Sequence, residues 1–453
     1  MNQTFFFFDD FLLAEYRNVV RRFAQPKFVE EGTFPGGDWL VSVEYLPKEG
    51  IYRMWHRKCL AVPDRSPRPD TSLYPVMALA QSEDGIRWVP ARLPSTVDKL
   101  TSQDPAICFS GVTFCDEFHV FRDPNDPEFP YKTAYVDKDE EGQHRMWLAF
   151  SKDGVRWQTP RISWLPTPIW SDTQNHLIYN PVTGRYQITC RRDFVDRRVC
   201  LVESADLVEW SEPRVILHPD PLDVPCVEFY GLPVFYYEGI FIGFLLLYFP
   251  DMGERAKPAY RGYTVTELVY SYNGLHWNRT RHVLLDRRPL GELGGGQVFG
   301  SHLLLDPRTD QLYIYAYGTL HEHGIPGPTG VLLYTLRKDG FVYLESVGEG
   351  YICTKPLLLE EPKVSLNLCA PHGQVSIQVS DEEGRPFPNF SFEDFGHWKG
   401  DSTDFEPVWG ERGLEELVGK TVRFEFRMSE ARLYAIRGSL RPFHGSTPLV
   451  GYG

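Results

Sequence analysis

Four carboxylic acids are the side chains whose types and places in this chain could do chemistry. They are Asp38, Asp123, Asp172 and Glu228. Cleavage of a glycosidic bond needs a carboxylate that is ionised as nucleophile or base and a carboxyl group that is protonated as acid. A third carboxylate then adjusts the pair or holds sugar hydroxyls. A single acid is more often a solvated or turn-capping residue, so the hypothesis depends on a fold that brings the four together.

A repeated heptapeptide predicts such a fold. Each copy follows an apolar, strand-like run and combines a Ser, an Asp-Gly or similar pair and a closing Trp. The four clear copies are 82–88, 151–157, 204–210 and 271–277, and a degenerate fifth is 337–341. Asp-Gly supplies the positive φ of a tight turn, and the Trp would pack back on the sheet. The repetition predicts a β-propeller of about five blades, with unrelated hairpins of a β-sandwich as the alternative.

The chain is therefore expected to be all-β, with a five-bladed propeller over residues 31–350. Its blades are predicted at 38–88, 117–157, 172–210, 228–277 and 294–344. The innermost strand of each blade lines the central funnel, so polar residues at the beginnings of those strands converge. After Gly350 strictly alternating strands predict a C-terminal β-sandwich over 351–453, without a cluster of titratable catalytic groups. Residues 1–30 are interpreted as an extension that packs on the propeller.

Short motifs resemble two glycosidase families. Phe121-Arg-Asp-Pro124 resembles the Arg-Asp-Pro signature of glycoside hydrolase family 32, the invertase, inulinase and levanase group. Gly37-Asp38-Trp39 lies where that family has its Asn-Asp-Pro-Asn-Gly segment. Val227-Glu228-Phe-Tyr-Gly-Leu-Pro233 is similar to the Glu-Cys-Pro segment of family 32 and the Glu-Gly-Pro segment of family 43. Both families are five-bladed propellers, and family 32 adds a C-terminal β-sandwich.

The resemblance implies catalytic roles for three of the acids. Asp38 would be the nucleophile or base, Asp123 the transition-state stabiliser and Glu228 the acid/base. The chain departs from both families, because Asp38 lacks its flanking Asn and Pro-Asn-Gly and Glu228 lacks the following Cys-Pro. The family acid belongs to the third blade, where this chain has Asp172, so Asp172 is a rival for that role. The apolar residues that flank Glu228 in the sequence favour Glu228 as the protonated acid. Asp172 would then bind the substrate or adjust the pKa of the catalytic pair.

Further residues are predicted to contact a substrate. His56 and Arg192 would bind sugar hydroxyls, Asn175 belongs to the Asp172 segment, and Trp55 and Tyr230 would stack on sugar rings. His321 and His323 form an H-x-H pair with no third ligand nearby in sequence, so no catalytic metal is predicted. The resemblance to family 43 leaves room for a structural Ca²⁺ in the funnel, and no organic cofactor is expected.

Composition narrows the class of protein. The 453 residues exceed one ordinary core and predict two domains. Aromatic residues make up 14%, and 36 Pro and 38 Gly suit short strands and turns rather than a helical or disordered chain. A net charge of −14 argues against nucleic acid or an anionic membrane as partner. Eight scattered cysteines without C-x-x-C pairs and an N-terminus without a convincing signal peptide predict a cytoplasmic protein with reduced thiols.

The favoured hypothesis is a glycoside hydrolase that acts on an oligosaccharide or glycoside. By resemblance the bond would be that of a furanoside, with a fructosyl or arabinosyl residue. A transglycosylase or an inorganic-phosphate-dependent phosphorylase on the same scaffold is an alternative, which Arg191, Arg192, Arg197 and Arg198 keep open. A non-catalytic carbohydrate-binding propeller is the other. The oligomeric state, the anomer and the linkage are not indicated.

Overall fold

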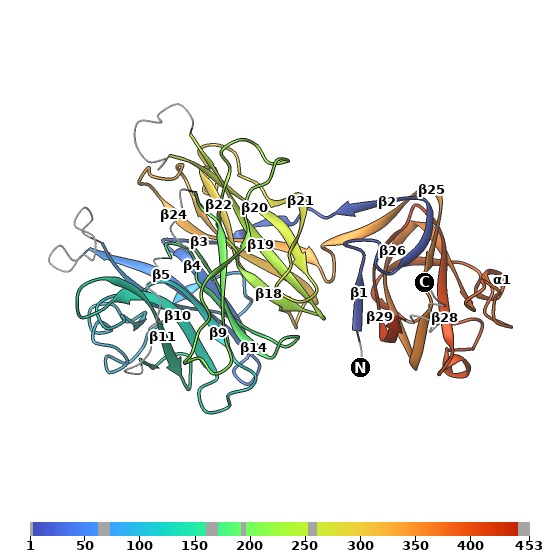
Figure 1. The fold of residues 1–453 in the computed structure, drawn as a ribbon, viewed down its shortest axis with the longest axis horizontal. Coiled ribbons are helices and arrows are strands. Elements are labelled where there is room, and N and C mark those ends of the chain that lie inside the picture. The colour runs from blue at the N-terminus through green and yellow to red at the C-terminus, as the bar shows by residue number, and fades with distance from the viewer. Residues whose placement is uncertain (1–2, 62–72, 160–170, 192–195, 252–260, 443–453) are drawn as a thin grey trace, which may run out of the picture. The chain divides into compact units, whose positions relative to one another are not determined.

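The computed structural model describes residues 3–61, 73–159, 171–191, 196–251 and 261–442. The predicted all-β fold is confirmed, because the regular secondary structure of the described residues is strand apart from one four-residue α-helix and one three-residue 3-10 helix. The chain divides into two compact units (Figure 1). One comprises residues 26–335, and the other comprises residues 1–25 together with 336–453.

The larger unit consists of antiparallel sheets of four principal strands that follow one another along the chain. The first three sheets are β4 (Asp38–Leu46), β5 (Ile51–Ala61), β6 (Leu73–Ser82) and β7 (Val89–Pro90), with β8 (Ile107–Phe109) at the side; β9 (Asp116–Arg122), β10 (Tyr131–Lys138), β11 (His144–Ser151) and β12 (Trp157–Gln158); and β13 (His176–Asn180), β14 (Arg185–Arg191), β15 (Val199–Ser204) and β16 (Arg214–Leu217). These sheets correspond to the first three predicted blades.

The last two blades are joined by one parallel residue pair between β20 and β22. They are β17 (Glu228–Gly231) with β18 (Val234–Tyr237), β19 (Ile240–Pro250), β20 (Gly262–Ser271) and β21 (Asn278–Leu285); and β22 (Gln297–Asp306), β23 (Gln311–Thr319), β24 (Thr329–Arg337) and β3 (Lys27–Pro35). Strands of neighbouring blades contact in succession, and β22 and β23 contact β4. The five blades therefore close into a ring.

Ring closure uses a strand that the sequence analysis placed elsewhere. The outer strand of the fifth blade is β3, which precedes the first blade and pairs antiparallel with β24. The degenerate fifth repeat at 337–341 does not lead to an outer blade strand. It lies between β24 and β25, where Asp339 is fully buried and forms an ion pair with Arg437. The prediction that this copy ends the fifth blade is therefore wrong.

The four clear repeats form the same hydrogen-bonded turn between the third and fourth strands of their blades. In the first copy Ser82 Oγ accepts from Gly85 N at 2.9 Å, and Asp84 Oδ1 accepts from the backbone N of Ile86 and of Arg87 at 2.8 Å. The other copies repeat these bonds from Ser151, Ser204 and Ser271. The left-handed position is Gly in three copies and Leu207, with φ 66°, in the remaining one.

Each repeated turn docks on the preceding blade. Tyr315 of blade five donates to Gly85 O at 2.7 Å, and Trp55 of blade one donates to Gly154 O at 2.7 Å. Asn180 of blade three donates to Asn273 O at 2.8 Å. In blade three's turn, Leu207 packs against the core cluster that contains Met146 and Leu148 of blade two. The repeat is therefore an inter-blade contact as well as a turn.

The smaller unit is one sheet whose path closes on itself. Its strands are β1 (Gln3–Phe6), β2 (Leu13–Phe23), β25 (Val342–Thr354), β26 (Leu357–Ser380), β27 (Trp398–Phe405), β28 (Thr421–Ser429) and β29 (Arg432–Pro442), with α1 (Phe392–Phe395). β26 pairs with both β28 and β29, and β25 joins the same two strands on the other side. The expected two-sheet sandwich over 351–453 is thus replaced by a curled sheet around one apolar core.

The N-terminal residues belong to this smaller unit. β1 pairs with β29, and β2 pairs with β25 along most of its length. Phe5 and Phe7 are part of its apolar core. The strand pairing therefore contradicts the prediction that residues 1–30 form an extension packed on the propeller, because β1 and β2 belong to the sheet of the smaller unit. In the described part of the chain, no helix has the length and apolarity needed to span a membrane.

Three buried histidines lie together on inner strands of the propeller. The rings of His119 (β9) and His176 (β13) stack with centroids 3.4 Å apart, and His302 (β22) lies 6.3 Å from His119. Burial lowers the pKa of His119 and His176 well below the ordinary value and that of His302 to about 4. All three are thus neutral in the folded protein at neutral pH.

Acidification should destabilise the propeller through these histidines. Below a pH of about 6.5 the unfolded chain binds protons that the folded chain does not, so the free energy of unfolding falls as pH falls toward about 4. The slope approaches about 1.4 kcal/mol per pH unit for each histidine. We expect His302→Asn to show a shallower fall in denaturant unfolding between pH 6.5 and 4.5. The exposed His372→Asn is the control, and an unchanged slope in His302→Asn would contradict this account.

Candidate functional site

The first residues of the inner strands meet at one end of the propeller. β4 begins at Asp38, β9 at Asp116, β13 at His176 and β17 at Glu228. Asn175 links two of these places, because its backbone N and its Nδ2 donate to Glu117 O at 3.1 and 2.8 Å. This end of the ring, defined by the beginnings of β4, β9, β13 and β17, is called the strand-start rim below.

Tyr230 is the buried centre of the strand-start rim. Its side chain belongs to a residue that is 2% exposed, and its ring lies 5.5 Å from that of Trp39. The guanidinium of Arg191 lies 4.7 Å from the ring centroid and that of Arg197 lies 5.5 Å from it. Burial raises the pKa of Tyr230, and the charges of Asp172 and Glu117 raise it further. The phenol therefore stays protonated, with its oxygen 3.4 Å from His323 Nε2.

Two predicted carboxylates reach this tyrosine through arginines. Arg191 Nη2 donates to Asp172 Oδ2 at 2.9 Å, and Arg197 Nη1 donates to Glu228 Oε2. The side chains of Asp172 and Glu228 are 30% and 18% exposed, so solvent and ligands can reach both. Glu228 was expected in an apolar setting, but a guanidinium contacts its carboxylate.

Arg191 carries a further donor at the strand-start rim. Its Nη1 atom is buried and has no hydrogen-bond partner within the described residues. A buried guanidinium N–H without an acceptor is costly, and such groups in native proteins are usually met by water or a ligand. The atom therefore marks a place for an acceptor oxygen beside Asp172.

Glu117 is a site residue that the sequence analysis missed. It is 3% exposed, it follows the first residue of β9, and its φ of 53° lies in the left-handed region. Strained backbone of this kind is frequent at functional sites. In its ionised form the Glu117 carboxylate raises the pKa of Tyr230, as Asp172 does. Glu117 was named as the beginning of the second predicted blade, so strand position alone would have selected it.

Asp123 lies at the other end of β9, which corrects its predicted role. It directly follows the seven residues of this strand, roughly 20 Å of chain from the strand-start rim at about 3.3 Å per residue. Its buried carboxylate pairs with Lys132 Nζ at 2.9 Å and accepts from Tyr186 Oη at 2.7 Å. These contacts are those of a buried structural ion pair, and Asp123 does not meet Asp172 or Glu228.

Two predicted substrate contacts are also buried in packing. Trp55 is 2% exposed, and its indole N–H holds the repeated turn of blade two at Gly154. His56 is 3% exposed, its Nδ1 lies 2.9 Å from Arg57 O, and its ring meets Phe34 edge-on at 5.4 Å. Both side chains are thus held in packing contacts, and a sugar-binding role for them stays a prediction.

The remaining predicted residues divide into three cases. Asn175 is fully buried and positions Glu117 rather than contacting solvent. The backbone of Asp38 opens β4 opposite Arg57, whose guanidinium bonds Asp116 at 2.9 Å, and the side chain of Asp38 lies outside the described part. Arg192 also lies outside the described residues. Asp38 and Arg192 therefore remain sequence predictions.

No group of three or more His, Cys, Asp or Glu that could hold a metal ion occurs among the residues that the structure describes. His323 of the H-x-H pair instead lies against the rings of Tyr230 and Tyr248. All eight cysteines lie among the described residues, and none of them forms a disulfide. The expectations of no organic cofactor and of room for a structural Ca²⁺ are not tested by these observations and stay predictions.

The strand-start rim thus combines partly exposed carboxylates, a buried carboxyl group and two guanidinium groups around one phenol. Carboxylates and guanidiniums bind hydroxyl and oxyanion groups, and two carboxyl groups in different environments can divide acid and base roles. This arrangement can perform proton transfer on a polar substrate without involving Asp123.

Comparisons with known proteins give structural similarity alone. No family model matches the chain, and no curated protein matches it. It is similar to a thermostable family-43 glycoside hydrolase (15% identity, TM-score 0.45, 70% of this chain and 95% of that one). It is also similar to β-1,2-mannobiose phosphorylase from Listeria innocua (14% identity, TM-score 0.46, 71% of this chain and 97% of that one). A third similar structure is an N-acetylgalactosamine deacetylase from F. plautii in complex with blood group B trisaccharide (14% identity, TM-score 0.46, 70% of this chain and 94% of that one).

The structural role of Asp123 predicts a large loss of stability on substitution. Asp123→Ala leaves buried Lys132 with Asp126 as its remaining carboxylate and removes the acceptor of Tyr186 Oη, which together cost about 2–3 kcal/mol of unfolding free energy. Glu128→Gln on the same hairpin is the control, because that carboxylate is 70% exposed and its ion pair with Lys152 contributes about 1 kcal/mol or less. Denaturant unfolding measures both. Unchanged stability of Asp123→Ala would return Asp123 to the list of functional candidates.

Proposed function

We propose that this protein cleaves glycosidic bonds by acid/base catalysis at the strand-start rim. The observation that carries the proposal is the convergence of Glu117, Asp172 and Glu228, from three successive blades, around buried Tyr230 with two arginines. Such a set of carboxyl groups in unlike surroundings is what glycoside cleavage needs. The resemblance to families 32 and 43 supports the same reaction.

The surroundings suggest how the roles divide. Burial disfavours the charged form of a carboxyl group, so Glu117 is the better candidate for the protonated acid. Glu228 is held by the guanidinium of Arg197 and fits the ionised partner or a hydroxyl-binding role. Asp172 with Arg191 would bind sugar hydroxyls, since Asp172 is partly exposed and one N–H of the buried Arg191 has no acceptor in the described part. Asp38 keeps the proposed role of nucleophile or base from the resemblance.

The proposed substrate is a glycoside whose sugar is suggested by the family resemblance. The resemblance favours a furanoside with a fructosyl or arabinosyl residue, and an oligosaccharide or simple glycoside would carry it. A screen of chromogenic furanosides and pyranosides tests both the activity and this preference. The absence of cleavage of every member of such a screen, with or without phosphate, would overturn the proposed reaction.

A second candidate is cleavage by inorganic phosphate in place of water. It is favoured by the two guanidinium groups at Tyr230, and in particular by the buried Arg191 Nη1 that has no partner among the described residues. Guanidinium groups bind phosphate through charge-assisted hydrogen bonds. Water and phosphate would then compete for the same reaction at the same carboxyl groups.

The proposed acid can be identified by its dependence on the leaving group. Glu117→Gln should lower turnover of a glycoside with a poor leaving group by about 10²–10⁴-fold, while largely sparing a glycoside with an activated aryl leaving group. Glu228→Gln should lower both, because the ionised partner acts whatever the leaving group. The control is Glu140→Gln, an exposed residue. A leaving-group effect in Glu228→Gln but not in Glu117→Gln would exchange the two roles.

Phosphate dependence separates the two candidate reactions. For a phosphorylase, turnover should rise with inorganic phosphate and release a sugar phosphate, and Arg191→Met should raise the KM for phosphate severalfold. For a hydrolase, the rate should be independent of phosphate and the product should be the free sugar. Arg156→Met, on the exposed turn of blade two, is the matched control. Product analysis by mass spectrometry with and without phosphate makes the distinction.

A further inference from the structure

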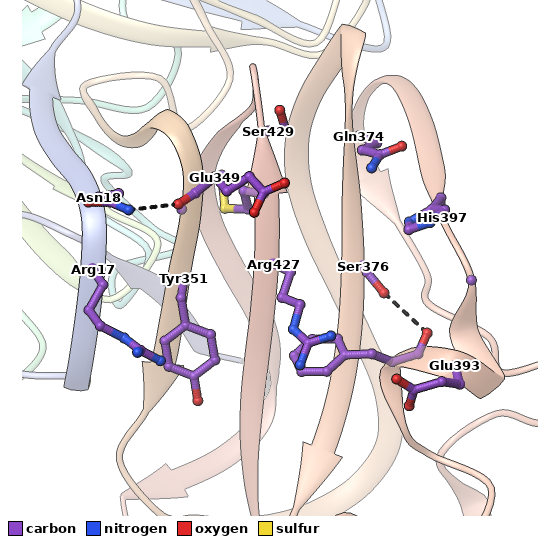
Figure 2. Close-up of a pocket in the computed structure, with 14 residues that line it drawn as sticks. Arg17, Asn18, Glu349, Tyr351, Gln374, Ser376, Glu393, His397, Arg427 and Ser429 are labelled. Atoms are coloured by element: carbon purple, nitrogen blue, oxygen red, sulfur yellow. Dashed lines mark hydrogen bonds between the residues drawn. The ribbon is translucent and has the colours of Figure 1, made fainter.

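The smaller unit contains a polar groove that lies on its sheet and that the proposed function does not use. Its volume is about 800 Å³, within the range of about 300–1,000 Å³ that is usual for ligand sites. Figure 2 shows the groove, whose floor crosses β2, β25, β28 and β26 and whose wall is the segment around α1. All lining residues belong to this unit.

The strand register arranges the floor in rows. Arg17 pairs with Tyr351, Tyr351 with Arg427, and Arg427 with Ser376, so one row crosses four neighbouring strands. Neighbouring strands lie about 4.8 Å apart, so polar groups recur at that spacing across the row. This places hydrogen-bonding groups at intervals comparable with the width of a sugar ring.

A second row lies beside the first. Glu349 pairs with Ser429, and Ser429 pairs with Gln374. Residues two apart on a strand share a face, and Figure 2 shows both rows in the same groove. The neighbouring residues Ile352 and Phe426 are fully buried in the core on the other side of the sheet. The groove is therefore a polar face supported by a rigid apolar layer.

The groups of the floor and wall are held in place. Arg17 lies over the Tyr351 ring at 4.8 Å and Arg427 lies over the Phe392 ring at 4.0 Å. Tyr351 Oη donates to Glu425 at 2.6 Å, and Ser376 Oγ donates to Phe392 O at 3.2 Å, which ties the wall to the floor. Because these side chains are ordered before binding, less conformational entropy is lost when a ligand binds.

Several groups in the groove have hydrogen-bonding capacity left. Glu349, Glu393, His397 and Arg427 are exposed and Gln374 is half-buried, so these side chains can exchange water for ligand hydroxyls, and Arg427 also contacts the Phe392 ring. Two guanidiniums and two carboxylates balance in charge, which does not favour a polyanion. The mixture of donors and acceptors suits hydroxyl groups, since each hydroxyl both donates and accepts. An apolar ligand would leave these groups without partners.

From this balance of charge, spacing and unused donors and acceptors, we infer that the groove binds a neutral oligosaccharide chain. The site is separate from the strand-start rim and does not depend on the reaction proposed there. It would hold a polymeric glycan by its hydroxyl groups, through the guanidinium of Arg427 and the carboxylate of Glu393 above all. The smaller unit is then a carbohydrate-binding unit of the protein.

The test is affinity electrophoresis of the full chain in gels that contain inulin, arabinan, mannan or polygalacturonate. At least one of the neutral polysaccharides should retard the wild type. Arg427→Met keeps the apolar contact with Phe392 but removes the donors, and Glu393→Gln removes a charge without changing shape. Each should weaken binding by about tenfold to a hundredfold, as expected for the loss of one hydrogen bond to a charged group.

Matched controls separate this groove from other surfaces. Arg412→Met and Glu416→Gln alter an exposed ion pair of the same unit and should leave retardation unchanged. Arg191→Met alters the strand-start rim, which is also proposed to bind sugar hydroxyls, and therefore measures how much of the retardation is due to that site. Retardation by polygalacturonate alone, retardation by no neutral polysaccharide, or retardation lost in Arg191→Met but kept in Arg427→Met and Glu393→Gln would each overturn the inference. Thermal unfolding of each variant verifies that it is folded, and Glu393→Gln carries the test if Arg427→Met is not.

Discussion

The docking of each repeated turn on the preceding blade is the interaction on which the strand-start rim depends. A propeller blade is a small sheet that buries little apolar surface alone, so its neighbours must fix its position. Here a carbonyl of the turn is held by a buried donor of the blade before it, as in Trp55 to Gly154 and Tyr315 to Gly85. Because the second of these contacts joins blades one and five, it also supports the closure made by β3 and β24.

Fixed blades place residues far apart in sequence at one end of the ring. Glu117, Asp172 and Glu228 belong to successive blades, and they meet because each stands at or near the beginning of an inner strand. Asn175 reinforces this by bonding the backbone of Glu117 from the next blade. The arginines add the opposite charge, so the carboxylates can lie near one another without strong mutual repulsion.

Much of this architecture could be predicted from the sequence, because the repeat reports local chemistry. Ser, Asp and Gly form the turn through bonds within a few residues, so the four clear copies located four blades. The outer strand of blade five could not be found in this way, since β3 joins β24 by a pairing between distant segments. The positions of the N-terminal strands β1 and β2 could not be predicted for the same reason, because their partners lie more than three hundred residues away.

Some of the site residues could likewise be located from the sequence, and others could not. Asp172 and Glu228 were found from their places at strand beginnings, and both lie at the strand-start rim. Asp123 was placed at a strand beginning by the same reasoning, with support from the Arg-Asp-Pro match, but it directly follows the end of β9. The burial of Trp55 and His56 could not be predicted, because contacts with a neighbouring blade and with β3 cover them.

The two buried carboxylates near opposite ends of β9 show why burial alone does not identify function. Asp123 is fully enclosed, and its charge is balanced by Lys132, whose side chain is also buried. Such a pair is closed to a substrate, and its atoms already have their partners. Glu117 is buried beside residues that solvent reaches, with the partly exposed Asp172 and Arg191 Nη1 lacking a described acceptor nearby. What distinguishes the candidate site is therefore a buried group next to accessible charges that still have hydrogen-bonding capacity. The groove of the smaller unit has the same kind of unused capacity, on a surface where it serves binding without catalysis.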